Sequence, residues 1–161
     1  MVDTSKKVIL LVLSTTRHNP NTINVAIEEA KARGARLHIL FILDSAMAND
    51  IYARLTDLGF IGEKPSHQIS DAILGEYRMR GEAKIREVEE KAKSAGIETG
   101  SSLSEGDFVA ICLSEINTLR TDLVILSRKK RSNLSRFLFG SSVDKLKRSA
   151  TCEIRVIDEA E

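Results

Sequence analysis

The chain has 161 residues, of which 42% are apolar and 29% charged, and 24 Lys and Arg against 23 Asp and Glu give a formal charge of +1. This composition argues against a disordered polyelectrolyte and against a protein whose whole surface binds nucleic acid. Aromatic residues make up 4% of the sequence and include no Trp, so stacking platforms for single-stranded nucleic acid are scarce. The length predicts one domain over residues 1–161.

The first fifty residues predict a strand, a helix and a second strand. Residues 8–13 form a continuous apolar run, which is typical of a strand buried on both faces of a parallel sheet. Asn19 and Pro20 are typical of an N-cap and a first helical residue, and Gly34 is a typical helix end. A second buried strand is predicted over residues 37–43.

The middle of the chain contains one clear element and one open question. In residues 71–94, apolar side chains recur at spacings of three and four, which predicts a long amphipathic helix that ends at Gly96. Residues 45–70 show no sustained period and are interpreted as a variable excursion. Their apolar side chains allow two readings, a plain excursion or an exposed patch that meets a partner.

The second half of the chain predicts three more strands. Residues 97–103 are polar enough for an edge strand, and residues 105–107 predict a turn and a helix cap. Residues 121–126 are apolar throughout and predict a buried strand, followed by a basic loop over residues 127–136 and a short helix. Residues 153–157 alternate between apolar and charged side chains, which indicates a last strand at a sheet edge.

Alternation of strands and helices predicts the fold class, an α/β doubly wound parallel sheet of the Rossmann-like kind with helices on both faces. The two most apolar strands, the first and the fourth, are expected to be central neighbours. Ligands of such sheets bind beyond the carboxyl ends of the strands, where the strand order reverses. The crevice is therefore predicted between Ser14, Thr15 and Thr16 on one side and Ser127 and its successors on the other.

Six segments of the sequence match the pattern of a known family. They are residues 8–13, 41–44, 105–107, 121–126, 133–143 and 152–157, and the strongest match is Asn-Leu-Ser-Arg-Phe-Leu-Phe-Gly-Ser-Ser-Val at 133–143. In these segments the chain resembles the universal stress protein family along nearly its whole length. The resemblance implies a five-stranded sheet in the order 3-2-1-4-5 and a homodimer formed through the last strand.

One branch of that family binds ATP through a G-x2-G-x9-G-[ST] motif after the fourth strand. The resemblance puts Gly140 and Ser141 at the end of this motif, whereas Ser127 and Lys130 stand where its first two glycines would be. Glycines there let backbone amides approach phosphates closely. The Asp that this branch carries after the first strand is Ser14 here. The candidate cofactor-binding residues are Ser14, Ile42, Ser127, Lys130, Gly140, Ser141 and Ser142.

Two functions remain open at this point. The departure from the motif favours a non-enzymatic, dimeric stress-response and interaction module with a degenerate nucleotide pocket. The alternative is a molecular switch that binds ATP or AMP, with weak hydrolysis, through a modified phosphate loop. In that case the cationic side chains of residues 128–131 would replace the glycine amides, and Gly140, Ser141 and Ser142 would contact phosphate at a helix N-terminus.

The charge of the chain is unevenly distributed. Residues 128–148 contain eight Lys or Arg and one Asp, a net charge of +7, so the rest of the chain carries −6. This basic segment is a candidate surface for an anionic ligand, an RNA or a phosphorylated protein partner. Specific DNA binding is not expected.

No catalytic residue and no metal site are predicted. His18, His38 and His67 lack the spacing of metal ligands, and no G-x-S-x-G elbow presents a serine for attack. Cys112 has no basic neighbour in sequence that would activate a thiol. The apolar runs are too short for a signal segment or a membrane span, and two cysteines suit a reducing compartment. These features predict a cytoplasmic protein that does not associate with membranes.

Overall fold

The computed structural model describes residues 6–44, 65–129 and 142–159. Within these residues a single parallel sheet forms, in the order β3-β2-β1-β4-β5. The fold class predicted from the sequence and the strand order implied by the resemblance are confirmed, and β1 and β4 are neighbours as expected. The strands are β1 (Val8–Ser14), β2 (Arg36–Asp44), β3 (Thr99–Gly106), β4 (Leu123–Lys129) and β5 (Glu153–Glu159).

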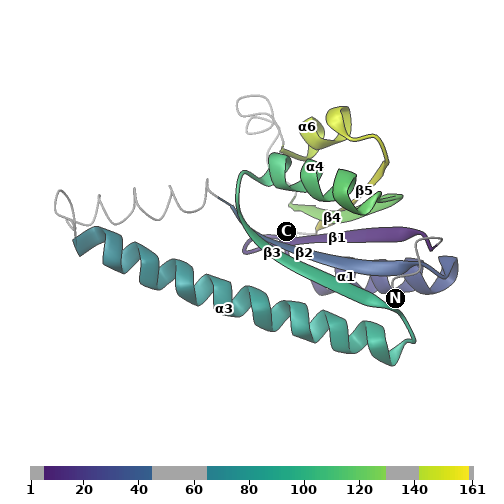
Figure 1. Cartoon of the computed structure of the whole chain (residues 1–161), viewed down its shortest axis with the longest axis horizontal. Helices are drawn as coiled ribbons and strands as arrows, with labels where there is room; N and C mark the ends of the chain where they lie inside the picture. The colour runs from purple at the N-terminus through teal and green to yellow at the C-terminus, as the bar shows by residue number, and fades with distance from the viewer. Residues whose placement is uncertain (1–5, 45–64, 130–141, 160–161) are drawn as a thin grey trace.

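Helices cover both faces of the sheet (Figure 1). Leu11 and the other odd-numbered apolar residues of β1 pack with α1 (Pro20–Arg33) and α3 (Pro65–Ser94). Leu10 and Val12 pack with α4 (Phe108–Leu119) and α6 (Ser142–Ser149) on the other face. Because both faces of β1 are buried, its residues 8–13 are all apolar instead of alternating. In the described part of the chain, no helix combines the length and apolarity needed to span a membrane.

The predicted limits of α1 are confirmed at both ends. The side chain of Asn19 accepts a hydrogen bond of 2.8 Å from the amide of Asn21, and Pro20 is the first helical residue. At the other end Gly34 adopts a left-handed conformation with φ of 60°, and its amide bonds back to the last turn. A residue with a Cβ would be strained in that conformation.

Three predicted boundaries are wrong by several residues. Glu105 and Gly106 lie in β3 and not in a turn, because they pair with the last residues of β2, so Asp107 alone caps α4. The basic loop begins later than predicted, because residues 127–129 pair with residues 157–159 of β5. Helix α3 begins at Pro65, earlier than the predicted start at Asp71. The rest of the predicted excursion, residues 45–64, lies outside the described residues.

Helix α3 packs very closely on the sheet at Gly81. A Cβ added to this glycine would lie 2.8 Å from two ring carbons of Phe41 and 3.2 Å from Leu103. Phe41 belongs to β2 and is 3% exposed. The missing side chain at position 81 therefore sets the distance between α3 and β2.

Strand β5 forms one edge of the sheet, as its alternating sequence predicted. Ile154 and Val156 pack on the side of α4 and α6. Arg155 lies toward α1, where its Nη1 is 2.8 Å from Oε1 of Glu29. This ion pair ties the edge strand to a helix of the opposite layer.

Candidate functional site

The carboxyl ends of β1 and β4 bring together part of the predicted cofactor-binding set. Ser14 and Ser127 are 3% and 1% exposed, and Ser14 is the register partner of Ile42, which is fully buried. Ser142 is the exposed first residue of α6. The remaining candidates, Lys130, Gly140 and Ser141, lie outside the described residues.

Arg17 crosses the predicted crevice from the β1 side to the β4 side. Its Nη1 donates a hydrogen bond of 2.8 Å to the backbone carbonyl of Ser127, and its guanidinium carbon lies 5.0 Å from the ring centroid of Phe108. The turn that carries Arg17 is closed by two backbone hydrogen bonds with Ser14, of 2.9 and 3.0 Å. A charged donor on a carbonyl and a cation over an aromatic face both hold this side chain in place.

Arg128, the first residue of the basic segment 128–148, is partly neutralised by two carboxylates. Arg128 lies 3.8 Å from Asp144 and 3.2 Å from Asp158. These contacts direct its guanidinium toward α6 and β5, where it forms ion pairs within the protein. Residues 130–141 of this segment lie outside the described residues.

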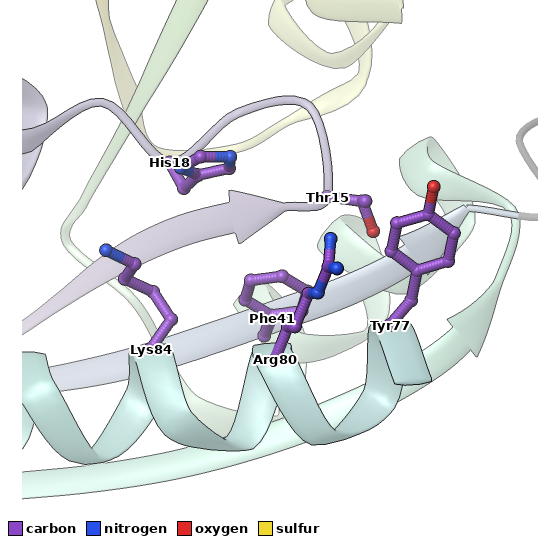
Figure 2. Close-up of a pocket in the computed structure, with 6 residues that line it drawn as sticks. All are labelled: Thr15, His18, Phe41, Tyr77, Arg80 and Lys84. Atoms are coloured by element: carbon purple, nitrogen blue, oxygen red, sulfur yellow. The ribbon is translucent and has the colours of Figure 1, made fainter. Parts of the chain in front are cut away.

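A separate cavity of about 290 Å³ lies between the β1–α1 turn and α3, and we call it the α3 pocket. Figure 2 shows side chains from three elements around it: the turn after β1 faces the helix, and the ring of Phe41 lies between them. The lining residues are Thr15, His18, Phe41, Tyr77, Arg80 and Lys84.

The cationic side chains of the α3 pocket are held by neighbours on the same helix. Arg80 donates a hydrogen bond of 2.7 Å to Glu76 and lies over the ring of Tyr77, 5.8 Å from its centroid. Lys84 is 2.9 Å from Glu87. The hydrogen bond from Lys84 lowers the pKa of the Glu87 carboxyl, so this carboxyl is ionised at neutral pH.

His38 belongs to a polar cluster in the sheet, away from both of these sites. Its Nε2 is 3.0 Å from Oγ of Ser102 and 3.6 Å from Oε2 of Glu115. In a Ser-His-acid triad the two ring nitrogens face the serine and the acid separately, whereas here one nitrogen meets both. Burial lowers the pKa of His38, so the neutral ring is favoured. We interpret the cluster as a half-buried hydrogen-bonded group that links β2 and β3 to α4.

Two further observations bear on chemistry. Burial raises the pKa of the Cys112 thiol to about 12, so this cysteine is a poor nucleophile. Among the residues that the structure describes, no three His, Cys, Asp or Glu side chains are grouped so as to hold a metal ion. The expectation that the chain has no catalytic residue stays a prediction.

Sequence reasoning missed Arg17 and the α3 pocket. Arg80 and Lys84 are four residues apart and therefore share one face of α3, beside the small Gly81. That spacing is the signal that could have located one wall of the pocket. The opposite wall, at His18, comes from a turn more than sixty residues away, and no local pattern connects the two.

Comparisons with known proteins agree with the fold. A model described as the universal stress protein family matches residues 6–158. A universal stress protein from Lactobacillus plantarum superposes with a TM-score of 0.70 and 14% identity, over 94% of this chain and 97% of that one. No curated protein sequence matches the chain significantly.

Two similar structures were solved with nucleotides. A universal stress protein in complex with cAMP has a TM-score of 0.61 and 17% identity, over 92% of this chain and 95% of that one. One from Archaeoglobus fulgidus in complex with dAMP has a TM-score of 0.51 and 13% identity, over 94% and 97%.

Proposed function

Because the chain belongs to the universal stress protein family, we propose that it is a dimeric, non-enzymatic stress-response and interaction module of the cytoplasm. In this proposal its switch-point crevice is filled by its own Arg17. The observation that carries the proposal is the bridge from Arg17 to the carbonyl of Ser127 across the face of Phe108. As a nucleotide site the crevice is degenerate, because the side chain of Arg17 takes up the space between β1 and β4.

The energy of this bridge sets how strongly it opposes a ligand. A hydrogen bond that involves a charged group contributes about 1.5–3 kcal/mol. A nucleotide that displaces Arg17 from Ser127 binds with a free energy that is less favourable by that amount. This corresponds to a roughly 10- to 150-fold weaker affinity. The replacement of the family's Asp by Ser14 further removes a carboxylate partner for the adenosine moiety.

The test combines nucleotide binding with removal of the bridge. We expect the natively purified protein to carry no nucleotide in mass spectrometry, and millimolar ATP or AMP to leave its melting temperature unchanged. Arg17→Ala should gain a nucleotide-dependent shift, whereas the control Arg78→Ala, which removes an exposed arginine paired with Glu105, should not. Co-purified ATP or AMP in the unmodified protein would refute the filled crevice.

The dimer is proposed to form through β5. Among the described strands β5 is the last of the sheet and has no partner on its outer edge, which favours pairing with a second copy. Val156→Pro is expected to remove a backbone donor and to give a monomer in analytical ultracentrifugation with unchanged helical circular dichroism. A variant that stays dimeric, or an unmodified protein that is monomeric at every concentration, rejects this interface.

A second candidate is a switch that binds ATP or AMP. It is favoured by the two similar universal stress proteins solved with cAMP and dAMP. In this case millimolar ATP or AMP raises the melting temperature of the unmodified protein. Gly140→Val, which adds a side chain beside the phosphates, abolishes that shift. The two candidates thus predict opposite results for the same titration.

A further inference from the structure

The α3 pocket is separate from the crevice that Arg17 fills. Phe41 points to the side of α1 and α3, where its ring packs in their core cluster. Phe108, under the guanidinium of Arg17, packs in the cluster of α4 and α6. The two sites are therefore on opposite sides of the sheet, and a ligand of the α3 pocket has no need to displace the Arg17 bridge.

Cationic groups converge on the pocket from two directions. Figure 2 shows both side chains rising from α3, with the Lys84 ammonium on the side of the His18 ring and the Arg80 guanidinium beside Thr15 and Tyr77. None of the described lining residues is a carboxylate. Glu76 and Glu87 lie beside the pocket and orient Arg80 and Lys84 through contacts of 2.7 and 2.9 Å. These two carboxylates offset part of the positive charge, and the attraction that remains is stronger for a dianion than for a monoanion.

The rest of the lining is aromatic. Phe41 is 3% exposed and is held against α3 by the close approach at Gly81. Tyr77 is half-buried on the same side of the helix. The ring of Tyr77 offers flat apolar surface to a planar group, and the small exposed part of Phe41 adds an apolar contact at the lining. Contacts between aromatic rings contribute beyond the area that they bury. Thr15 adds a hydroxyl that can donate or accept a hydrogen bond.

We propose that the α3 pocket binds a small aromatic phosphomonoester. Its phosphate faces His18, Arg80 and Lys84, and its ring lies against Phe41 and Tyr77. A phosphomonoester carries a charge of about −1.5 to −2 at pH 7, which matches the cationic lining. The cavity of about 290 Å³ is at the small end of ligand pockets, so the ligand is a single-ring or similarly compact compound.

Phenyl phosphate is the probe that tests both halves of this proposal. Calorimetric titration should show binding that is roughly tenfold tighter than that of inorganic phosphate, which lacks the ring, or of benzoate, which lacks the dianion. The backbone amide resonances of Thr15 and His18 should shift during the same titration. Added salt should weaken the binding, because dissolved ions screen the attraction between the phosphate and the solvent-exposed cationic side chains.

Three variants of α3 locate the site. Arg80→Met and Lys84→Met should each weaken phenyl phosphate binding roughly tenfold, the usual effect of losing one charged contact. Lys93→Met is the matched control, because Lys93 is an exposed lysine of the same helix, 4.0 Å from Glu89, that does not line the pocket. It should bind phenyl phosphate as the unmodified protein does.

Three results would overturn the proposal. The first is the absence of both heat and amide shifts at millimolar phenyl phosphate. The second is equal affinity for inorganic phosphate and phenyl phosphate, which would show that the rings contribute nothing. The third is an equal loss of affinity in the Lys84 and Lys93 variants. Because the amide shifts are measured on the unmodified protein, the location of the site is tested even if one variant fails to fold.

Discussion

Gly81→Ala should destabilise the protein although alanine is the better helix former. Position 81 lies inside α3, and an alanine Cβ there would sit 2.8 Å from Cδ1 and Cε1 of Phe41 and 3.2 Å from Leu103. Carbon atoms attract each other best at about 3.5–4.0 Å. Phe41 is buried in the core, so either its ring or the whole helix must move by several tenths of an ångström.

The magnitude follows from two opposing effects. Overpacking of a filled core costs about 1–3 kcal/mol, and replacing a helical glycine by alanine gains about 1 kcal/mol. The net change at Gly81 is therefore a loss of about 0–2 kcal/mol in the free energy of unfolding. Gly75 of the same helix is the matched control, because a Cβ there meets nothing within 4 Å. Gly75→Ala should gain about 0.5–1 kcal/mol.

Urea and thermal denaturation of the two variants measure this difference. The free energies of unfolding of the Gly75 and Gly81 variants should differ by about 0.5–3 kcal/mol. Each kcal/mol corresponds to roughly 2–4 °C in melting temperature. Phenyl phosphate binding to Gly81→Ala should weaken as well, since a displaced α3 moves Arg80 and Lys84 away from the turn. If Gly81→Ala is as stabilising as Gly75→Ala, the helix is not seated against Phe41 as described and the reasoning is refuted.

The remaining predictions concern protonation, capping and thiol reactivity. Acidification from pH 8 to pH 5 should lower the free energy of unfolding. Burial, opposed by Glu115 and aided by Arg36, lowers the pKa of His38 in the folded protein below its usual 6.5. As the pH falls, the unfolded chain therefore takes up a proton before the folded protein does, and the loss of stability ends below the folded-state pKa. Urea denaturation of His38→Gln should show a flatter pH profile, and an unchanged profile would contradict the assignment. Asp107→Ala removes the 2.9 Å side-chain bond to the amide of the third residue of α4 and should cost about 1 kcal/mol, a fall of roughly 2–4 °C in melting temperature. Iodoacetamide should leave Cys112 unmodified at pH 8 until the protein unfolds, because its pKa is about 12; peptide mass spectrometry that finds early labelling would argue against a buried thiol.

Much of the fold could be predicted because its signals are local. The apolar run of β1 and the caps Asn19 and Gly34 each depend on a few adjacent residues, and the structure confirms them. The limits of β3 and β4 could not be predicted in the same way. Ser127, Arg128 and Gly106 are strand residues because their backbones pair with a neighbouring strand, and that pairing overrides their low intrinsic preference for strands.

The candidate sites were less accessible to sequence reasoning, because they depend on long-range contacts. Arg17 meets Ser127 across 110 positions of the chain. His18 and Lys84 line one cavity since α3 packs on β2 next to the β1–α1 turn. The strand pattern predicted Ser14 at the carboxyl end of the first strand, and the structure makes it the register partner of the candidate residue Ile42. What they bind stays a prediction.

The short turn after β1 has a consequence for how the two sites communicate. Arg17 and His18 are adjacent, yet one reaches toward β4 and the other lines the α3 pocket. A ligand that pulls His18 toward α3 therefore acts on the backbone that also positions Arg17. If occupation of the pocket weakens the Arg17 bridge, opening of the crevice must tighten ligand binding in the pocket by the same factor, since coupling between two binding equilibria is reciprocal. In the two proposals above, this turn is the covalent link between the ligand of the α3 pocket on one side of the sheet and the crevice on the other.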